Sequence, residues 1–168
     1  MALHSATQPA TQGVLHLASW EQRLLTWAQE AMASPVHGDQ QTLNQGALSA
    51  ADQYCRQITR DNSRTFYLAS GLLSREKRKA VQALYAFCRS TDDIVDRAQA
   101  GDDVEALLAE WRSRLANQRQ AAHDPVPLAW ATAQLRYAIP HGYAEQLIAG
   151  ITRDLYQNRY PTFEALTE

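Results

Sequence analysis

Apolar residues recur at spacings of three and four along most of this chain, and this helical period constrains its fold more than any other feature. From Ser49 onward, no segment shows the alternation of apolar and polar residues that is typical of a half-buried strand. Residues that favour caps, turns or helix ends separate the periodic segments: Asp61 to Ser63, Gly71, Ser74, Asp102 or Asp103, Pro125 and Pro127, and Pro140. The pattern predicts an all-α fold without internal repeats.

The first 48 residues differ from the rest of the chain. Residues 1–13 are small and polar, which is typical of disorder. An apolar stripe then predicts one amphipathic helix: Leu17, Trp20, Leu24, Trp27 and Ala31. Its polar face is not rich in Lys, which favours packing on the protein over docking on a membrane. A linker rich in Gly, Pro, Gln and Asn follows from Ser34 to about Ala47. We therefore expect an N-terminal extension, residues 1–48, and a helical domain, residues 49–168.

The composition excludes several classes of protein. The 168 residues carry a formal charge of -2, so there is no basic excess of the kind that binds nucleic acid. Cys55 and Cys88 form no CxxC or Cys/His pattern, which disfavours a metal or disulfide framework and fits a reducing compartment. No apolar run approaches the ~20 residues of a membrane span. The first twenty residues contain no acid, Lys or Arg, so they resemble neither a secretory signal nor a transit peptide. These features predict a cytoplasmic protein.

One predicted helix, from Ser74 to about Ala98, contains the most unusual pattern in the chain. At about 100° per residue, four polar side chains fall within about 60° of one another and form one stripe: Tyr85, Arg89, Asp92 and Asp96. Apolar residues flank the stripe on both sides: Val81, Leu84, Cys88 and Val95 on one, and Ala80, Ala83, Phe87 and Ile94 on the other. Such a helix is expected to be largely buried, with the stripe facing an interior cavity.

Helix stability does not explain the two aspartates of the stripe, because like charges one turn apart repel and Asp is a poor helix former. A hard divalent cation does explain them, since Mg²⁺ takes oxygen ligands, commonly one or two carboxylates with phosphates and waters. Arg89 can hold a neighbouring carboxylate or bind a phosphate through its planar guanidinium group. The alternative is a solvated charged face with an incidental pair of aspartates, and the spacing alone does not decide between the two.

A second polar feature lies at the start of the preceding predicted helix. Ser63, Arg64 and Thr65 offer hydroxyl and guanidinium donors that suit a phosphate at a helix N-terminus. An ordinary helix cap explains the same residues.

One run of the chain closely resembles the first signature block of the squalene and phytoene synthase family: NSRTFYLASGLLSREKRKAVQALYAFCRSTDDIVD. A later run resembles another segment of that family, and its Arg-Tyr-x-Thr-Phe-Glu form is closer to the phytoene synthase branch: ITRDLYQNRYPTFEAL. The resemblance covers about residues 50–163, and the first fifty residues have no counterpart. It implies the N-terminal part of an all-α isoprenoid-synthase fold.

The resemblance also implies roles for the residues of both polar features. Asp92 and Asp96 match the family's first aspartate-rich motif and would bind Mg²⁺, with Mn²⁺ as the alternative, while Asp93 is a neighbour without an assigned role. Arg89 and Tyr85 match catalytic positions that contact diphosphate and substrate. The segment that grips a diphosphate is matched by four residues: Asn62, Ser63, Arg64 and Thr65.

The activity implied is a prenyltransferase that joins two geranylgeranyl diphosphates head to head, through prephytoene diphosphate, to phytoene in carotenoid biosynthesis. No nicotinamide cofactor is expected for this reaction. A squalene or dehydrosqualene type of synthase, acting on farnesyl diphosphate, is the nearest alternative. A non-catalytic helical module derived from the family is the other, and the presence of Asp92 and Asp96 counts against it.

Family members carry a second aspartate-rich motif beyond the region that this chain matches. We therefore expect the chain to be a fragment that is inactive alone. Peripheral membrane contact is compatible with greasy substrates and products, whereas the oligomeric state and the choice between a C30 and a C40 product stay open.

Overall fold

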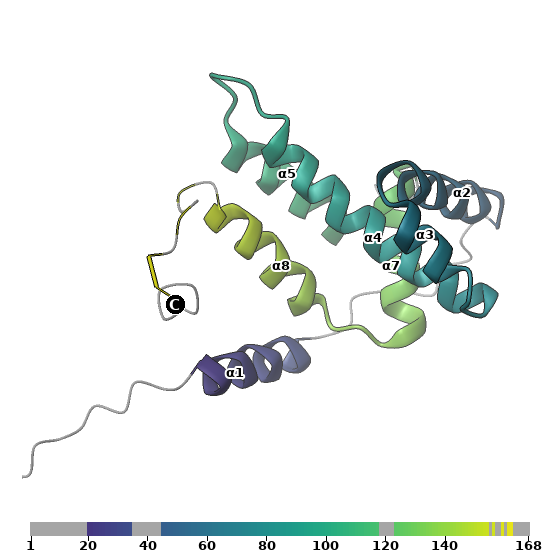
Figure 1. Cartoon of the computed structure of the whole chain (residues 1–168), viewed down its shortest axis with the longest axis horizontal. Coiled ribbons are helices and arrows are strands. Elements are labelled where there is room, and N and C mark those ends of the chain that lie inside the picture. The colour runs from purple at the N-terminus through teal and green to yellow at the C-terminus, as the bar shows by residue number, and fades with distance from the viewer. Residues whose placement is uncertain are drawn as a thin grey trace, which may run out of the picture.

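The computed structural model of the chain describes residues 20–34, 45–117 and 123–154, together with four single positions: Tyr156, Arg159, Pro161 and Thr162. All regular structure in these segments is helical, which confirms the predicted all-α fold. The helices of Figure 1 are α1 (Trp20–Ala33), α2 (Gln45–Asn62), α3 (Arg64–Ser70), α4 (Arg75–Asp96), α5 (Val104–Ala116), α7 (Pro125–Tyr137) and α8 (His141–Asp154). Within these helices, none is both long and apolar enough to cross a membrane.

Some expectations concern positions outside the described residues. They are the disorder of residues 1–13, most of the expected linker (residues 35–44), and Leu17 of the N-terminal apolar stripe.

Helix α4 is the centre of the fold, because it contacts α2, α3, α5, α7 and α8. The ring of Phe87 lies between two indoles, with its centroid 5.0 Å from that of Trp130 on α7 and 6.5 Å from that of Trp111 on α5. One turn later, the Thr91 hydroxyl accepts a hydrogen bond of 2.9 Å from Trp111 Nε1 and donates one of 2.9 Å to the Phe87 carbonyl. Stacked rings and satisfied polar groups therefore fix one face of α4.

The helix ends follow the local turn chemistry. Ser63 caps α3 by accepting a hydrogen bond of 3.3 Å from Phe66 N, and Asp103 caps α5 by accepting one of 3.0 Å from Ala106 N. Helix α4 begins directly after Ser74 as predicted, although the Ser74 hydroxyl makes no capping hydrogen bond. Helix α2 begins at Gln45, inside the stretch expected to be a linker, because Ala47 and Leu48 already pack against the core.

Helix α1 packs on α8, as expected for the N-terminal helix, and Figure 1 shows both on the side of the molecule away from α2 and α3. The contact is close: a Cβ at Gly142 would lie 2.7 Å from Ala31 Cα, and Gly142 N donates a hydrogen bond of 2.7 Å to Ser34 Oγ. Leu24 and Trp27, expected to face the core, are 50% and 39% exposed. The prediction was wrong for these two side chains, because small residues make the contact.

Candidate functional site

The polar stripe is present on α4, and one of its apolar flanks is only partly buried: Leu84 is exposed, whereas Cys88 and Val95 pack against the core. Tyr85, Arg89 and Asp92 are half-buried, and Asp96 is exposed. On one flank Phe87 is 1% exposed, whereas Leu84 on the other flank is 40% exposed. The prediction of a largely buried helix is therefore wrong for the flank that contains Leu84. The physical reason is that α5 and α7 supply the indoles that stack on Phe87, on the side of α4 opposite the stripe.

Helix α3 brings the second polar feature next to the stripe. The rings of Phe66 and Tyr85 stack with their centroids 5.1 Å apart and an angle of 27° between their planes. At the other end of α3, buried Gln82 Nε2 donates a hydrogen bond of 3.0 Å to Ser70 Oγ. Both ends of α3 are thus attached to α4, so that Ser63 lies one helical turn from the Phe66 ring that touches Tyr85.

The residues of the predicted diphosphate-gripping segment have different surroundings. Asn62 ends α2, and its side chain donates a hydrogen bond of 2.9 Å to the Ile58 carbonyl. Ser63 accepts the capping hydrogen bond of α3, which leaves its hydroxyl proton able to point toward a ligand. Arg64 and Thr65 are exposed. The capping interpretation is therefore confirmed for Ser63, and the gripping role of the four residues stays a prediction.

Asp93 received no role from the sequence, and the structure gives it one. Arg89 pairs with Asp93 one turn later, and Arg97 Nη2 lies 3.0 Å from Asp93 Oδ2. Asp93 therefore sits between two arginines and orients Arg89 at the edge of the stripe. The signal was available in the sequence, because ion pairs form between helical residues four apart and Arg89, Asp93 and Arg97 have this spacing.

Two further observations bear on what the stripe can bind. Arg89 Nε is buried and has no hydrogen-bond partner among the described residues, so this donor can serve a ligand. Burial raises the pKa of the Cys88 thiol, and the negative charge of Asp92 raises it further. Within the stripe, the oxygen ligands for a hard cation are the carboxylates of Asp92 and Asp96.

The carboxylates of the stripe form a small donor set. No group of three or more His, Cys, Asp or Glu side chains gathers around one point in the described part of the chain. Asp92 and Asp96, one turn apart on α4, are the pair that suits a hard cation whose other ligands are waters and phosphate oxygens. These residues therefore fit Mg²⁺ bound together with a diphosphate, and they do not fit an ion held by protein ligands alone.

Comparison with known proteins shows independently which family this chain resembles. Residues 59–168 match the model of the squalene/phytoene synthase family. A 15-cis-phytoene synthase of Synechococcus elongatus is 40% identical over 123 residues, which are 71% of this chain and 39% of that protein. A 15-cis-phytoene synthase of Synechocystis sp. is 36% identical over 124 residues, covering 71% and 36%. Phytoene synthase 3, chloroplastic, of Zea mays is 33% identical over 122 residues, covering 72% and 29%.

The described helices define an all-α protein built around one central helix that carries a pair of carboxylates. With 110 of its residues (59 to 168) matched, the chain belongs to the squalene/phytoene synthase family. It spans less than two fifths of the length of the three relatives named above. Both polar features, residues 62–65 and the stripe on α4, lie inside the matched region.

Proposed function

We propose that this chain forms the part of a phytoene-synthase-type prenyltransferase that holds Mg²⁺ and the diphosphate of a prenyl diphosphate substrate. The observation that carries the proposal is the placement of Asp92 and Asp96 on successive turns of α4, beside the unpartnered Nε donor of Arg89. The names of the relatives from Synechococcus elongatus and Synechocystis sp. support the phytoene branch of the family.

The chemistry of the proposed reaction explains this set of side chains. Ionisation of an allylic diphosphate leaves negative charge on the leaving group and positive charge on the prenyl chain. When bound by Asp92 and Asp96, Mg²⁺ would supply positive charge to the leaving diphosphate. Arg89, which pairs with Asp93, would supply a second positive charge to the leaving diphosphate.

Aromatic side chains border the polar stripe on the side of α3. The stacked pair of Phe66 and Tyr85 presents π-electron density that can stabilise a nearby carbocation. The exposed Arg64 and Thr65, with the hydroxyl of Ser63, would bind a diphosphate at the start of α3. Tyr85 thus joins the region that handles diphosphate to the region that would receive the prenyl chain.

The substrates that we propose are two geranylgeranyl diphosphates, joined to phytoene through prephytoene diphosphate, with no nicotinamide cofactor. The 168 residues supply one pair of carboxylates on this face of α4, and the relatives are more than twice as long as the stretch they share with the chain. We therefore infer that the 168-residue chain binds Mg²⁺ and diphosphate but does not carry out the condensation by itself.

The test is an assay with geranylgeranyl diphosphate and Mg²⁺ on the 168-residue chain and on the longest chain that the gene encodes. We expect phytoene from the longer chain only, and none from its Asp92→Ala/Asp96→Ala variant. The matched control is Asp102→Asn/Asp103→Asn, which removes two carboxylates beyond the end of α4 and keeps a residue able to cap α5. Activity only with farnesyl diphosphate would move the proposal to the squalene type. No condensation of either substrate would contradict it.

A further inference from the structure

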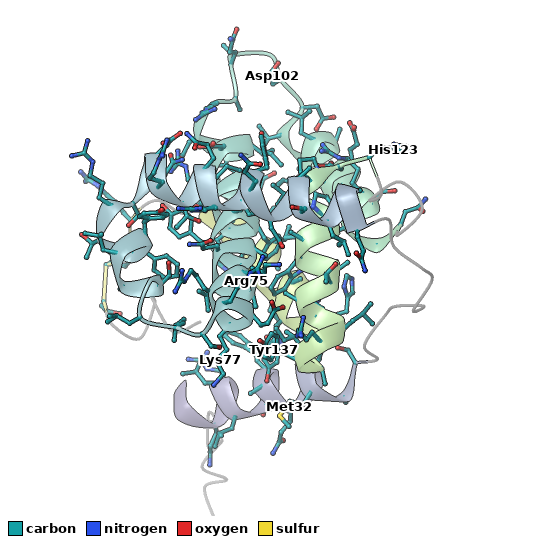
Figure 2. The ribbon with its side chains drawn as sticks, turned by 90° about the vertical axis from the view of Figure 1, so that its right-hand side faces the viewer. Met32, Arg75, Lys77, Asp102, His123 and Tyr137 are labelled. Carbon is teal, nitrogen blue, oxygen red and sulfur yellow. The ribbon has the colours of Figure 1, made fainter. Side chains whose placement is uncertain are left out.

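A basic groove lies between α2 and the N-terminal part of α4. It has a volume of about 360 Å³, and its lining includes four cationic side chains and a single carboxylate: Arg56, Arg75, Arg78 and Lys79, with Asp52. Figure 2 shows Arg75 on the face of the molecule that is turned to the viewer, below the helix α2 that crosses the view. Because the whole chain has a formal charge of -2, this concentration of positive charge does not follow from the composition.

The groove is separate from the polar stripe. Arg78 precedes Asp92 by fourteen positions on the same helix, which corresponds to about 21 Å along its axis. Helix α3 and the turn after it lie against α4 there, since Arg78 Nη2 donates hydrogen bonds to the carbonyls of Gly71 and Leu73, at 2.7 and 3.0 Å. A ligand in the groove therefore does not touch Asp92 or Asp96.

Of the four cations, only Lys79 is neutralised by a carboxylate of the described residues, through an ion pair of 2.7 Å with Asp52. Arg56 donates two hydrogen bonds, of 3.1 and 2.8 Å, to the neutral Tyr67 hydroxyl. Arg75 makes no ion pair with any residue of the described segments. Neutral oxygens thus orient Arg56 and Arg78 without cancelling their charge, and Arg78 Nε is buried without a hydrogen-bond partner in the described structure.

The cationic side chains that line the groove repel one another when no anion is bound. The positive end of α4 adds to the same potential, since Arg75 is its first residue and the Ser74 side chain does not cap it. Oriented guanidinium groups with unused N–H donors are the groups that recognise phosphate oxygens.

We propose that this groove binds a phosphate group without a metal ion. The ligand is a phosphate or diphosphate anion, either free in solution or as the headgroup of an anionic lipid. A metal is not required, because Lys79 already holds the carboxylate of the groove and the arginines supply the positive charge. The groove has room for a diphosphate, since a water molecule occupies only about 30 Å³ of liquid volume.

The first experiment titrates the 168-residue chain with inorganic phosphate and with diphosphate, at low ionic strength and with EDTA present, and follows binding by calorimetry. We expect saturable binding that is about tenfold weaker in the Arg56→Gln/Arg75→Gln variant. The matched control, Arg60→Gln/Arg153→Gln, removes two arginines that do not line the groove and should change the affinity less than about twofold. Circular dichroism of each variant verifies that it is folded.

The second experiment distinguishes the two sources of phosphate. The chain is sedimented with vesicles of phosphatidylcholine alone or with added phosphatidic acid, again in EDTA. Binding to the anionic vesicles that is lost in Arg56→Gln/Arg75→Gln identifies a lipid headgroup, whereas saturable binding of free anions without vesicle binding identifies a soluble phosphate. Absence of both, or an equal loss in the Arg60→Gln/Arg153→Gln control, would overturn the proposal and leave a solvated basic surface.

These results are independent of the proposed synthase function. EDTA removes the metal that Asp92 and Asp96 would need, and any metal-free binding of the anion at Arg64 or Arg89 would not depend on Arg56 and Arg75. An Asp92→Asn/Asp96→Asn variant should bind the metal-free anion as well as the unmodified chain does. Loss of that binding in the aspartate variant would also contradict the assignment of the ligand to the groove.

Discussion

The two sides of α4 differ in the burial and the hydrogen bonding of their polar groups. On the buried side, the Thr91 hydroxyl is fully enclosed, accepts a hydrogen bond from Trp111 and donates one to the backbone. On the polar side, Asp92 is half-buried, Asp96 is exposed, and Arg89 keeps an N–H donor without a partner. The first side satisfies its polar groups within the protein, as a core requires, whereas on the second side the Arg89 Nε donor has no hydrogen bond within the described structure.

We therefore expect one side of α4 to contribute to the stability of the fold and the other side to contribute to ligand binding. Side chains on the buried side should matter for folding and little for ligands, and the reverse should hold on the polar side. Variants on each side of α4 test this difference.

The largest expected effect is the loss of stability in Phe87→Ala. Removing the ring between Trp111 and Trp130 leaves a cavity in the core and should lower the free energy of unfolding by about 3–5 kcal/mol. Leu84→Ala, on the 40% exposed flank of the same helix, is the matched control and should cost less than about 1 kcal/mol. Urea unfolding followed by tryptophan fluorescence measures both. Equal losses would show that the two flanks are buried alike.

A smaller effect is expected on the polar side from Asp93→Asn. Without its carboxylate, Arg89 is no longer oriented, so the affinity for diphosphate in the presence of Mg²⁺ should fall about three- to tenfold. The free energy of unfolding should change by less than about 1 kcal/mol, because Asp93 and its partner Arg89 are partly exposed.

A double-mutant cycle tests whether Asp93 changes the affinity for diphosphate through Arg89. In an Arg89→Gln background, Asp93→Asn should have no further effect on the affinity for diphosphate, because Asp93 acts through Arg89. Additive losses from the two substitutions would contradict the positioning role.

A pH-dependent effect is expected from the buried thiol of Cys55 on α2. Burial raises the pKa of Cys55 from its usual 9.0 to about 12. The unfolded chain therefore loses this proton at lower pH than the folded chain does. The resulting stabilisation is fully present below about pH 9 and is lost as the pH rises through about 12. Unfolding at pH 8 to 11 should show a steeper loss of stability for the unmodified chain than for Cys55→Ala. If stability fell equally with pH in the unmodified chain and in Cys55→Ala, the raised pKa of the Cys55 thiol would be contradicted.

The sequence predicted the parts of the fold that depend on local chemistry. The caps at Ser63 and Asp103 were predicted because capping involves residues three positions apart. The polar stripe was predicted because the helical period places Tyr85, Arg89 and Asp92 on one side.

The parts that were not predicted depend on contacts between distant segments. Which flank of α4 is buried depends on how α2 and α7 pack against it. The exposure of Leu24 follows from the close contact of Ala31 with Gly142, far apart in the sequence. The basic groove brings Arg56 and Arg75 together from two helices, so no single stretch of sequence contains it. The Arg89–Asp93 pair is different, since its spacing was visible but gave no reason to prefer it over a contact with Asp92.

The most direct test of the central claim is equilibrium dialysis of Mn²⁺, as a substitute for Mg²⁺, against the 168-residue chain in the presence of diphosphate. We predict that the unmodified chain and Asp102→Asn/Asp103→Asn bind the metal, and that the affinity of Asp92→Asn/Asp96→Asn is at least about tenfold weaker. Metal binding of equal strength in all three proteins would contradict the claim that the polar side of α4 is a site for a divalent cation and diphosphate.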